Sequence, residues 1–372
     1  MAIDIIEVSS EKELKLFVDL PYQLYKRNKF WVPPMRNDEL KALQPQTNPA
    51  MEICASKFWI ALKDGKCVGR IGGIIVPLWN EKTNEKIARF SRPEFIDDEQ
   101  VADALLETVG NWAKSQGMDG LMGPLGFSNL DSSGLLIEGH DWLQSVASSY
   151  HFDYYQHHYN RLGFEKEVDW IEFRVTFPDV MPEKSLKVAE LIKTRFGLKV
   201  LNFKANKELN PYKEQFFGLF NQSFSVLFGT YELPDKLIRF YFSKYFPILN
   251  PKYVKMILDK EDKLAGFMFA LPSLSKAMQK AGGKLLPFGW YHILKALKHP
   301  VEMDLMLTGV KPELVKMGGV SILMNELWVS AQKDGVKEVE TTAMLENNPA
   351  TQIWKSFDHI QHKRKRCYRK MF

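Results

Sequence analysis

The chain has 372 residues, of which 45% are hydrophobic and 26% charged, and this length predicts two domains of an ordinary globular protein. A net charge of +5 is too small for a chain of this size to indicate nucleic-acid binding. The longest apolar stretch, 71–79, is too short for a transmembrane segment, and the N-terminus lacks the pattern of a signal peptide. Three cysteines without metal-binding spacing complete the prediction of a cytoplasmic protein without a metal site.

The first recognisable elements along the chain are a hairpin, a helix and a strand. Residues 58–71 alternate around a turn at Asp64-Gly65, which is typical of a β-hairpin. Residues 101–117 have apolar side chains at helical spacing and end at Gly117, a residue suited to a left-handed cap. A strand at 120–125 follows.

The same order returns in the second half of the chain. A hairpin at 254–268, a helix at 320–335 that ends at Gly335, and a strand at 338–344 match the first three elements. Matched positions lie 197 residues apart in the hairpins, from Gly69 to Gly266, and 218 apart at the helix ends. The second copy therefore carries 21 extra residues, which fall in the insertion 275–302.

This repeat predicts two tandem domains, 1–177 and 183–372, joined by a short linker between two prolines. The first copy has an insertion of its own at about 127–155. Strands that alternate with helices predict an α/β (α+β) protein, each copy being a mixed twisted sheet flanked by helices.

The segment 303–323 resembles the cofactor strand, loop and helix of the GNAT (Gcn5-related N-acetyltransferase) superfamily, chiefly through Gly309-Val310, Pro312-Glu313 and Gly318. Residues 345–355 are similar to the family's last helix, and Tyr159 to Phe164 resembles the end of that helix in the first copy. The whole chain also resembles a bacterial subgroup of two-domain GNAT-like proteins. The resemblance implies two acyl-CoA N-acyltransferase folds in tandem, with acetyl-CoA or another acyl-CoA as co-substrate.

A pyrophosphate needs an anion site, and a helix N-terminus with nearby glycines provides one through its backbone N–H groups. In the first copy the helix is entered through Asp97, Asp98 and Glu99, which would repel phosphate, so its cofactor loop is predicted to be degenerate. The second copy departs from the family pattern at Val315 and Val320. The predicted cofactor-binding residues are all in the second copy: Gly309, Val310, Lys316, Met317, Gly318, Gly319, Val320, Ser321 and Asn347.

Acyl transfer to an amine needs a base, donors for the oxyanion and an acid for the leaving thiolate. The family's tyrosine acid is replaced by Trp354, and Tyr368 is the candidate substitute, with a core aromatic as the alternative. Glu340 and Glu346 are candidate bases, or surface carboxylates. Asn347 either helps to hold CoA or caps the helix that starts at Pro349.

Two basic segments have more than one interpretation. Residues 362–370 read most simply as a solvated edge strand, or as a site for an anionic substrate. The insertion 284–298 has an apolar face and basic side chains, and it could be a lid over the acyl chain, a membrane-surface segment or a packing element between the domains.

These observations favour an acyl-CoA-dependent N-acyltransferase acting on a small amine or amino-acid-like acceptor in a groove between the domains. A catalytically inert binding or scaffold protein of the same fold is the alternative. Aminoacyl transfer from charged tRNA, as in the related Fem-type enzymes, would require a larger basic surface. The oligomeric state is not indicated.

Overall fold

The computed structural model describes residues 3–315 and 318–372, and the chain forms two compact units. Unit 1 consists of Met1–Ile171, Met278–Gly289 and Lys363–Phe372, and unit 2 of Glu172–Ala277 and Trp290–His362. The contact boundaries therefore differ from the sequence boundaries 177 and 183, because the last ten residues pack with unit 1. The strands β7 and β14 each contribute residues to both units.

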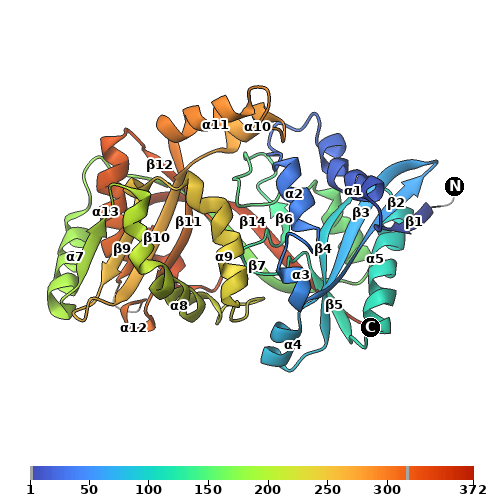
Figure 1. Ribbon diagram of the computed structural model, residues 1–372, viewed down its shortest axis with the longest axis horizontal. Helices are drawn as coiled ribbons and strands as arrows, with labels where there is room; N and C mark the ends of the chain where they lie inside the picture. Colours follow the sequence, from blue (N-terminus) through green and yellow to red (C-terminus); the bar gives the residue numbers. More distant parts are fainter. Residues whose placement is uncertain (1–2, 316–317) are drawn as a thin grey trace. The chain divides into compact units, whose positions relative to one another are not determined.

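Unit 1 is built on a mostly antiparallel sheet with the strand order β1-β2-β3-β4-β5-β14-β7 (Figure 1). The helix α5 packs on the strands of this sheet. The elements in chain order are β1 (Ile3–Glu7), α1 (Glu11–Leu24), α2 (Arg36–Ala42), α3 (Ala50–Ile53), β2 (Ala55–Lys63), β3 (Lys66–Ile75), α4 (Pro77–Thr83), β4 (Ile87–Phe95), α5 (Glu99–Ser115), β5 (Gly120–Gly123), β6 (Leu135–Glu138), α6 (Tyr154–Arg161) and β7 (Glu165–Thr176).

Unit 2 repeats the arrangement with the strand order β7-β12-β11-β10-β9-β8. Here α13 takes the place of α5, and α7 packs against it. The elements are α7 (Glu183–Phe196), β8 (Lys199–Asn202), α8 (Lys213–Phe224), α9 (Asp235–Tyr245), β9 (Val254–Leu258), β10 (Leu264–Pro272), α10 (Ser275–Ala281), α11 (Gly289–Lys298), β11 (Glu302–Val310), α12 (Pro312–Val315), α13 (Val320–Lys333), β12 (Glu338–Thr341), β13 (Met344–Leu345) and β14 (Asp358–Met371), with the 3₁₀ helices η1 (Asn206–Tyr212), η2 (Phe246–Ile248), η3 (Pro251–Tyr253) and η4 (Pro349–Ser356).

The structure confirms the predicted mixed α/β fold and the repeated elements. The first hairpin turns at Asp64 and Gly65, whose φ values of 52° and 73° are those of the tight turns that match strand twist. The helices α5 and α13 are followed by Gly117 and Gly335, both with φ of 75°. Of the 21 extra residues of the second copy, 18 lie between the matched positions Gly266 and Val310, the stretch that contains α10 and α11, and the other three lie after Val310.

The cores of the two units differ in composition. Aliphatic side chains of α5, among them Val101 and Leu105, pack on the sheet of unit 1 together with Phe90 and Tyr159. In unit 2 a cluster of phenylalanines fills the space between α8 and β10: Phe216 lies 4.7 Å from Phe267 and 5.1 Å from Phe269 between ring centroids. Such aromatic contacts add to the free energy of burial.

The C-terminal basic run does not form an edge strand, so that prediction is wrong. β14 lies between β5 and β7, and Lys363, Lys365 and Cys367 are buried on one face of it. The charges are compensated locally: Arg366 Nε donates to Asp169 Oδ1 at 2.8 Å, and Lys363 Nζ donates to the carbonyl of Leu143 at 2.8 Å. The abundance of Lys and Arg here reflects internal ion pairs in unit 1.

Within the described residues, no helix has both the length and the apolar composition that a membrane crossing requires.

Candidate functional site

Both units contain a pair of parallel strands that separate part-way along their length. In unit 2, β11 pairs with β12 from Glu302↔Glu338 to Leu305↔Thr341, after which β11 continues to Val310 along β10. In unit 1, β4 pairs with β5 at 87–89 and continues to Phe95 along β3. Where parallel strands separate, backbone amides and carbonyls along the inner edge become available to another partner. We call these the first opening (unit 1) and the second opening (unit 2).

Phe95 and Val310 occupy equivalent positions in these strands, because each pairs with the matched glycine of the preceding strand, Gly69 or Gly266. Phe95 and Val310 are 215 residues apart, whereas the helix ends at Gly117 and Gly335 are 218 apart. The second loop is therefore three residues longer, and it includes the short helix α12.

In the first opening, tyrosines of unit 1 occupy the end of β4. The amide of Phe95 donates to Tyr155 Oη at 2.9 Å, and Tyr154 donates to the Phe95 carbonyl at 2.5 Å. Glu94 accepts from Tyr25 at 2.6 Å and from Tyr155 at 2.9 Å, and burial raises the pKa of its carboxyl group to about 7. The backbone that could polarise a bound carbonyl is thus already hydrogen-bonded within unit 1.

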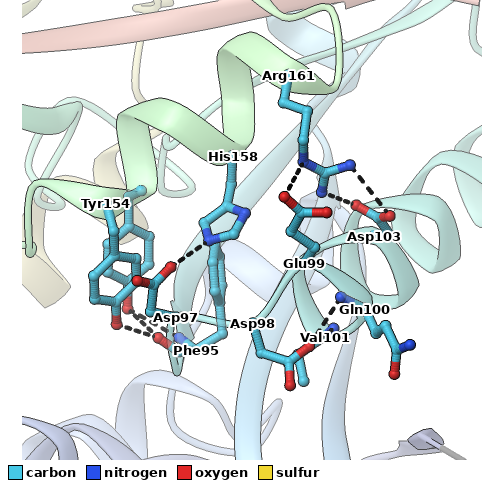
Figure 2. A network of polar contacts seen from close by, with 11 residues as sticks. Phe95, Asp97, Asp98, Glu99, Gln100, Val101, Asp103, Tyr154, His158 and Arg161 are labelled. Atoms are coloured by element: carbon cyan, nitrogen blue, oxygen red, sulfur yellow. Dashed lines mark hydrogen bonds and ion pairs between the residues drawn. The ribbon is translucent and has the colours of Figure 1, made fainter.

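The loop that follows β4 is filled with carboxylates, and Figure 2 shows how helix α6 closes over it. Asp98 caps α5 by accepting from the amides of Gln100 and Val101, at 2.9 and 3.3 Å, and Lys63 beside it holds the pKa of that carboxyl group below its usual range. From α6, His158 Nε2 contacts Asp97 at 2.9 Å, and Arg161 pairs with Glu99 and Asp103 (Figure 2).

The corresponding loop of unit 2 has glycines in place of these acids. Gly318 has φ of 79°, and a Cβ at Gly319 would lie 3.0 Å from Leu314 Cβ, so both positions favour glycine. The amides of Gly319 and Gly318 donate to the carbonyls of Leu314 and Val315, at 2.8 and 3.2 Å, the two bonds of a Schellman motif. For these two amides to donate to a phosphate, their hydrogen bonds to the Leu314 and Val315 carbonyls must first break.

The start of α13 carries no acidic residue in its first turn, and its N-cap, Gly319, makes no side-chain capping bond among the residues described. The amides of Ser321 and Ile322 donate to the carbonyls of Gly318 and Gly319, at 2.9 and 3.2 Å. Val320 is half-buried. Lys316 and Met317, two of the predicted cofactor residues, lie outside the described residues.

Gly309 and Val310 lie at the end of β11 and have clear packing roles. A Cβ at Gly309 would come within 2.6 Å of the Phe267 ring and 3.0 Å of Ser223 Oγ. The amide of Lys311 donates to the Ala265 carbonyl at 2.9 Å, and its ammonium group pairs with Asp259 at 2.7 Å. These contacts fix the point at which the chain leaves the sheet.

Glu340 lies on β12 opposite Asp304, one position before β11 and β12 separate. Its Oε1 atom is 3.2 Å from Nε2 of His362, and Nδ1 of His362 is 3.0 Å from the backbone carbonyl of Glu172. Because a carbonyl can only accept, Nδ1 donates to it, and Nε2 is the ring nitrogen that faces Glu340. The Glu340–His362 pair therefore lies at the base of the second opening.

The side chain of Glu172 completes this buried cluster. One ligand-type atom from each of Glu172, Glu340 and His362 lies within 4.8 Å of the others, an arrangement that could also hold a metal ion. Neither His362 nor Glu172 is among the site residues predicted from the sequence. A glutamate inside the apolar run 170–175 is the signal that could have found it.

The other candidates lie elsewhere. Tyr368 belongs to unit 1, pairs with Gly123 and packs against Tyr159 at 5.3 Å between ring centroids; burial raises the pKa of its hydroxyl. Glu346 and Asn347 are exposed in unit 2. The prediction that Asn347 caps the last helix is wrong, because Asn348 accepts from the Ala350 amide at 2.9 Å at the start of η4.

Unit 2 also has a groove of about 400 Å³ between α7 and α13. Of the sequence-predicted site residues that the structure describes, none lines it. The side chains that do are Leu186, Lys187, Ala189, Glu190, Lys193, Ile322, Asn325, Glu326 and Val329.

The fold of the chain is that of two GNAT domains in tandem. A tandem GNAT protein from the clavulanic acid biosynthesis pathway matches 100% of the chain and 98% of its own length with a TM-score of 0.57 at 12% identity. A Gcn5-related N-acetyltransferase from Sphaerobacter thermophilus matches 99% of the chain and 95% of its own length, with a TM-score of 0.54 at 8% identity. At these identities the likeness is one of fold.

Two relatives are similar in sequence. Protein YghO of Escherichia coli (strain K12) is 28% identical over 320 residues, which cover 84% of this chain and 77% of that protein. The bacterial ceramide synthase of Caulobacter vibrioides is 25% identical over 386 residues, which cover 99% of this chain and 97% of that enzyme. No family model matches the chain.

Proposed function

We propose that the chain is an acyl-CoA-dependent N-acyltransferase whose thioester binds in the second opening and whose acceptor is a long-chain, lipid-like amine. Two lines of support are the tandem GNAT fold and the similarity over nearly the full length to a ceramide synthase. A ceramide is the amide of a fatty acid and a long-chain amino alcohol, so the relative's name describes formation of an amide bond. The observation that carries the proposal for this chain is the Glu340–His362 pair beside separating parallel strands.

The chemistry follows from these groups. The amine nitrogen attacks the thioester carbon, the new C–N bond forms, and the C–S bond breaks to release CoA. A backbone amide at the end of β11, at Val310 or its neighbour, would donate to the oxygen that becomes negative. One member of the Glu340–His362 pair would accept the proton that the amine loses, and the pair would pass a proton to the leaving thiolate, so that the protons balance.

The loop between β11 and α13 would hold the CoA pyrophosphate. Its support is positional: it connects the strand of the second opening to a helix N-terminus that lacks acidic residues in its first turn. The equivalent loop of unit 1 has Asp98 at the helix cap and Arg161 paired with its neighbours, so we assign it no cofactor.

The test is an assay for CoA release with mass detection of the amide, using long-chain acyl-CoA with a long-chain amino alcohol and, in parallel, acetyl-CoA with small amines and amino acids. Amide formation with the long-chain pair is expected. Product only with small amines would contradict the lipid-like acceptor and would show that the acceptor is a small amine or an amino acid.

No product with any acceptor, from a protein that still binds acyl-CoA, would contradict the enzyme and favour a binding or scaffold role. Two departures from the family pattern support this second candidate function. Val320 stands where the family's loop ends in a small residue, and Trp354 stands where the family has a tyrosine. Trp354 is buried, and its indole donates to the sulfur of Met344.

A further inference from the structure

The segment 284–301, which we call the apolar tip, holds an unusual share of the exposed apolar surface. Of the 17 large hydrophobic side chains exposed among the described residues, seven lie in this stretch: Leu285, Leu286, Phe288, Trp290, Tyr291, Leu294 and Val301. Leu286 and Phe288 are 76% and 69% exposed. Exposed apolar groups scattered singly are normal, but seven within one stretch of the sequence, three of them aromatic, indicate a segment that makes an interaction.

The charge of the chain is concentrated around the same segment. Residues 275–301 contain five lysines and no aspartate or glutamate. Since the whole chain has 50 Lys and Arg against 45 Asp and Glu, removal of these five lysines leaves the rest formally neutral. The stretch 275–301 therefore carries a formal charge equal to the net charge of the whole chain.

The helix α11 presents both kinds of side chain on one side. Its exposed residues are Trp290, Tyr291, Leu294, Lys295 and Lys298, which follow helical spacing, while Ile293 and Leu297 are half-buried on the other side. Aromatic rings and leucines beside lysines are the composition of helices that lie in the interface of a lipid bilayer.

The turn before the apolar tip is held in place by unit 1. Gln279 Nε2 donates to the carbonyls of Lys29 and Trp31, both at 2.9 Å, and Arg36 donates to the carbonyls of Gly282 and Gly283 at 2.9 and 3.1 Å. Gly283 has φ of 77°, and a Cβ there would lie 2.5 Å from the Tyr22 ring. The exposed residues Leu285, Leu286 and Phe288 therefore come directly after a turn that is held by several hydrogen bonds.

We infer that the apolar tip docks the protein on an anionic membrane surface, with Leu286, Phe288 and Trp290 entering the headgroup region and Lys284, Lys295 and Lys298 facing anionic lipids. Charge complementarity selects this occupant, because an acid-free segment with five lysines is attracted to a negative bilayer. The inference does not depend on the proposed acyl transfer, although a lipid-like acceptor would be reached from such a surface.

The experiment is cosedimentation of the full-length protein with vesicles of phosphatidylcholine alone or of phosphatidylcholine and phosphatidylglycerol in equal amounts. Neither lipid has a free amine, and no acyl-CoA is added, so the outcome is separate from that of the acyltransferase assay. Wild type is expected to bind the mixed vesicles strongly and phosphatidylcholine weakly.

Two triple variants separate the two contributions. Lys284→Gln with Lys295→Gln and Lys298→Gln should weaken binding to mixed vesicles by roughly fivefold per lysine, on the order of a hundredfold in all, and leave binding to phosphatidylcholine unchanged. Leu286→Ser with Phe288→Ser and Trp290→Ser should weaken binding to both. Because all six side chains are exposed, the variants should fold, which circular dichroism checks.

The matched controls are comparably exposed residues elsewhere: Lys26→Gln, Lys66→Gln and Lys207→Gln for the charges, and Val180→Ser, Leu191→Ser and Val226→Ser for the apolar side chains. Wild type that fails to bind mixed vesicles, or controls that lose as much binding as the test variants, would overturn the inference. Self-association that the serine triple abolishes, without vesicle binding, would assign the surface to a second copy of the chain instead.

Discussion

The loops after β4 and β11 occupy equivalent places in two copies of one fold, yet their chemistry is opposite. The first is closed by its own side chains: Asp98 caps α5, and Arg161 of α6 pairs with the next acids. The second has Gly318 and Gly319, and α13 starts without an acid in its first turn. The difference teaches that two copies of one fold can satisfy the start of the same helix in different ways, by acidic side chains in one copy and by backbone carbonyls in the other.

The largest expected effect is on turnover in unit 2. Glu340→Gln removes the carboxylate whose Oε1 atom lies 3.2 Å from His362 Nε2, and we expect kcat to fall by about a hundredfold or more, since general acid–base groups contribute at least that much. CoA release under saturating substrates measures it. Glu232→Gln, at an exposed glutamate of the same unit, is the control and should leave the rate unchanged. Equal losses in both variants would remove Glu340 from the chemistry.

The second effect concerns the first opening and depends on pH. Burial raises the pKa of Glu94 to about 7 from an ordinary value of 4.5, so the folded state binds this proton more tightly than the unfolded state. The protonated carboxyl group makes its full contribution to the free energy of unfolding below about pH 4.5. As the pH rises to about 7, this contribution falls by about 3 kcal/mol.

Glu94→Gln cannot titrate, so the stability difference between wild type and this variant should shift by that amount across the window. Urea unfolding at a series of pH values measures it. A difference that stays constant from pH 4.5 to 8 would show that Glu94 does not carry a raised pKa in unit 1.

The smallest effect is at the cap of α5. Asp98→Ala removes the acceptor for the amides of Gln100 and Val101, and we expect the free energy of unfolding to fall by about 1 kcal/mol. Glu107→Ala, in the exposed middle of the same helix, should change stability little. If both variants unfold at the same urea concentration, the carboxylate is not needed to satisfy the start of α5.

Much of the fold could be predicted from the sequence because local signals repeat. The turn at Asp64-Gly65 and the glycines after α5 and α13 depend on neighbouring residues, and the same order of elements returns in the second copy. The place of β14 could not, because a run rich in Lys and Arg reads as solvent-exposed unless its partners, such as Asp169 and the Leu143 carbonyl, are known.

The site was predicted less completely. Motif spacing identified β11, its loop and Glu340, whose assignment to cofactor and catalysis remains a proposal. Glu172 lies more than a hundred residues before Glu340 and His362, and no local pattern reports that the three side chains meet. The Schellman bonds at Gly318 and Gly319 also show that a glycine pair before a helix can serve the backbone alone.

The central claim, that one loop of the two holds the cofactor, is tested most directly by calorimetric titration of the full-length protein with acyl-CoA. One site per chain is expected, lost in Gly318→Asp and kept in Gly335→Asp, which places the same side chain at a similar φ at the other end of α13. Two sites per chain, or identical heats for wild type and Gly318→Asp, would contradict it.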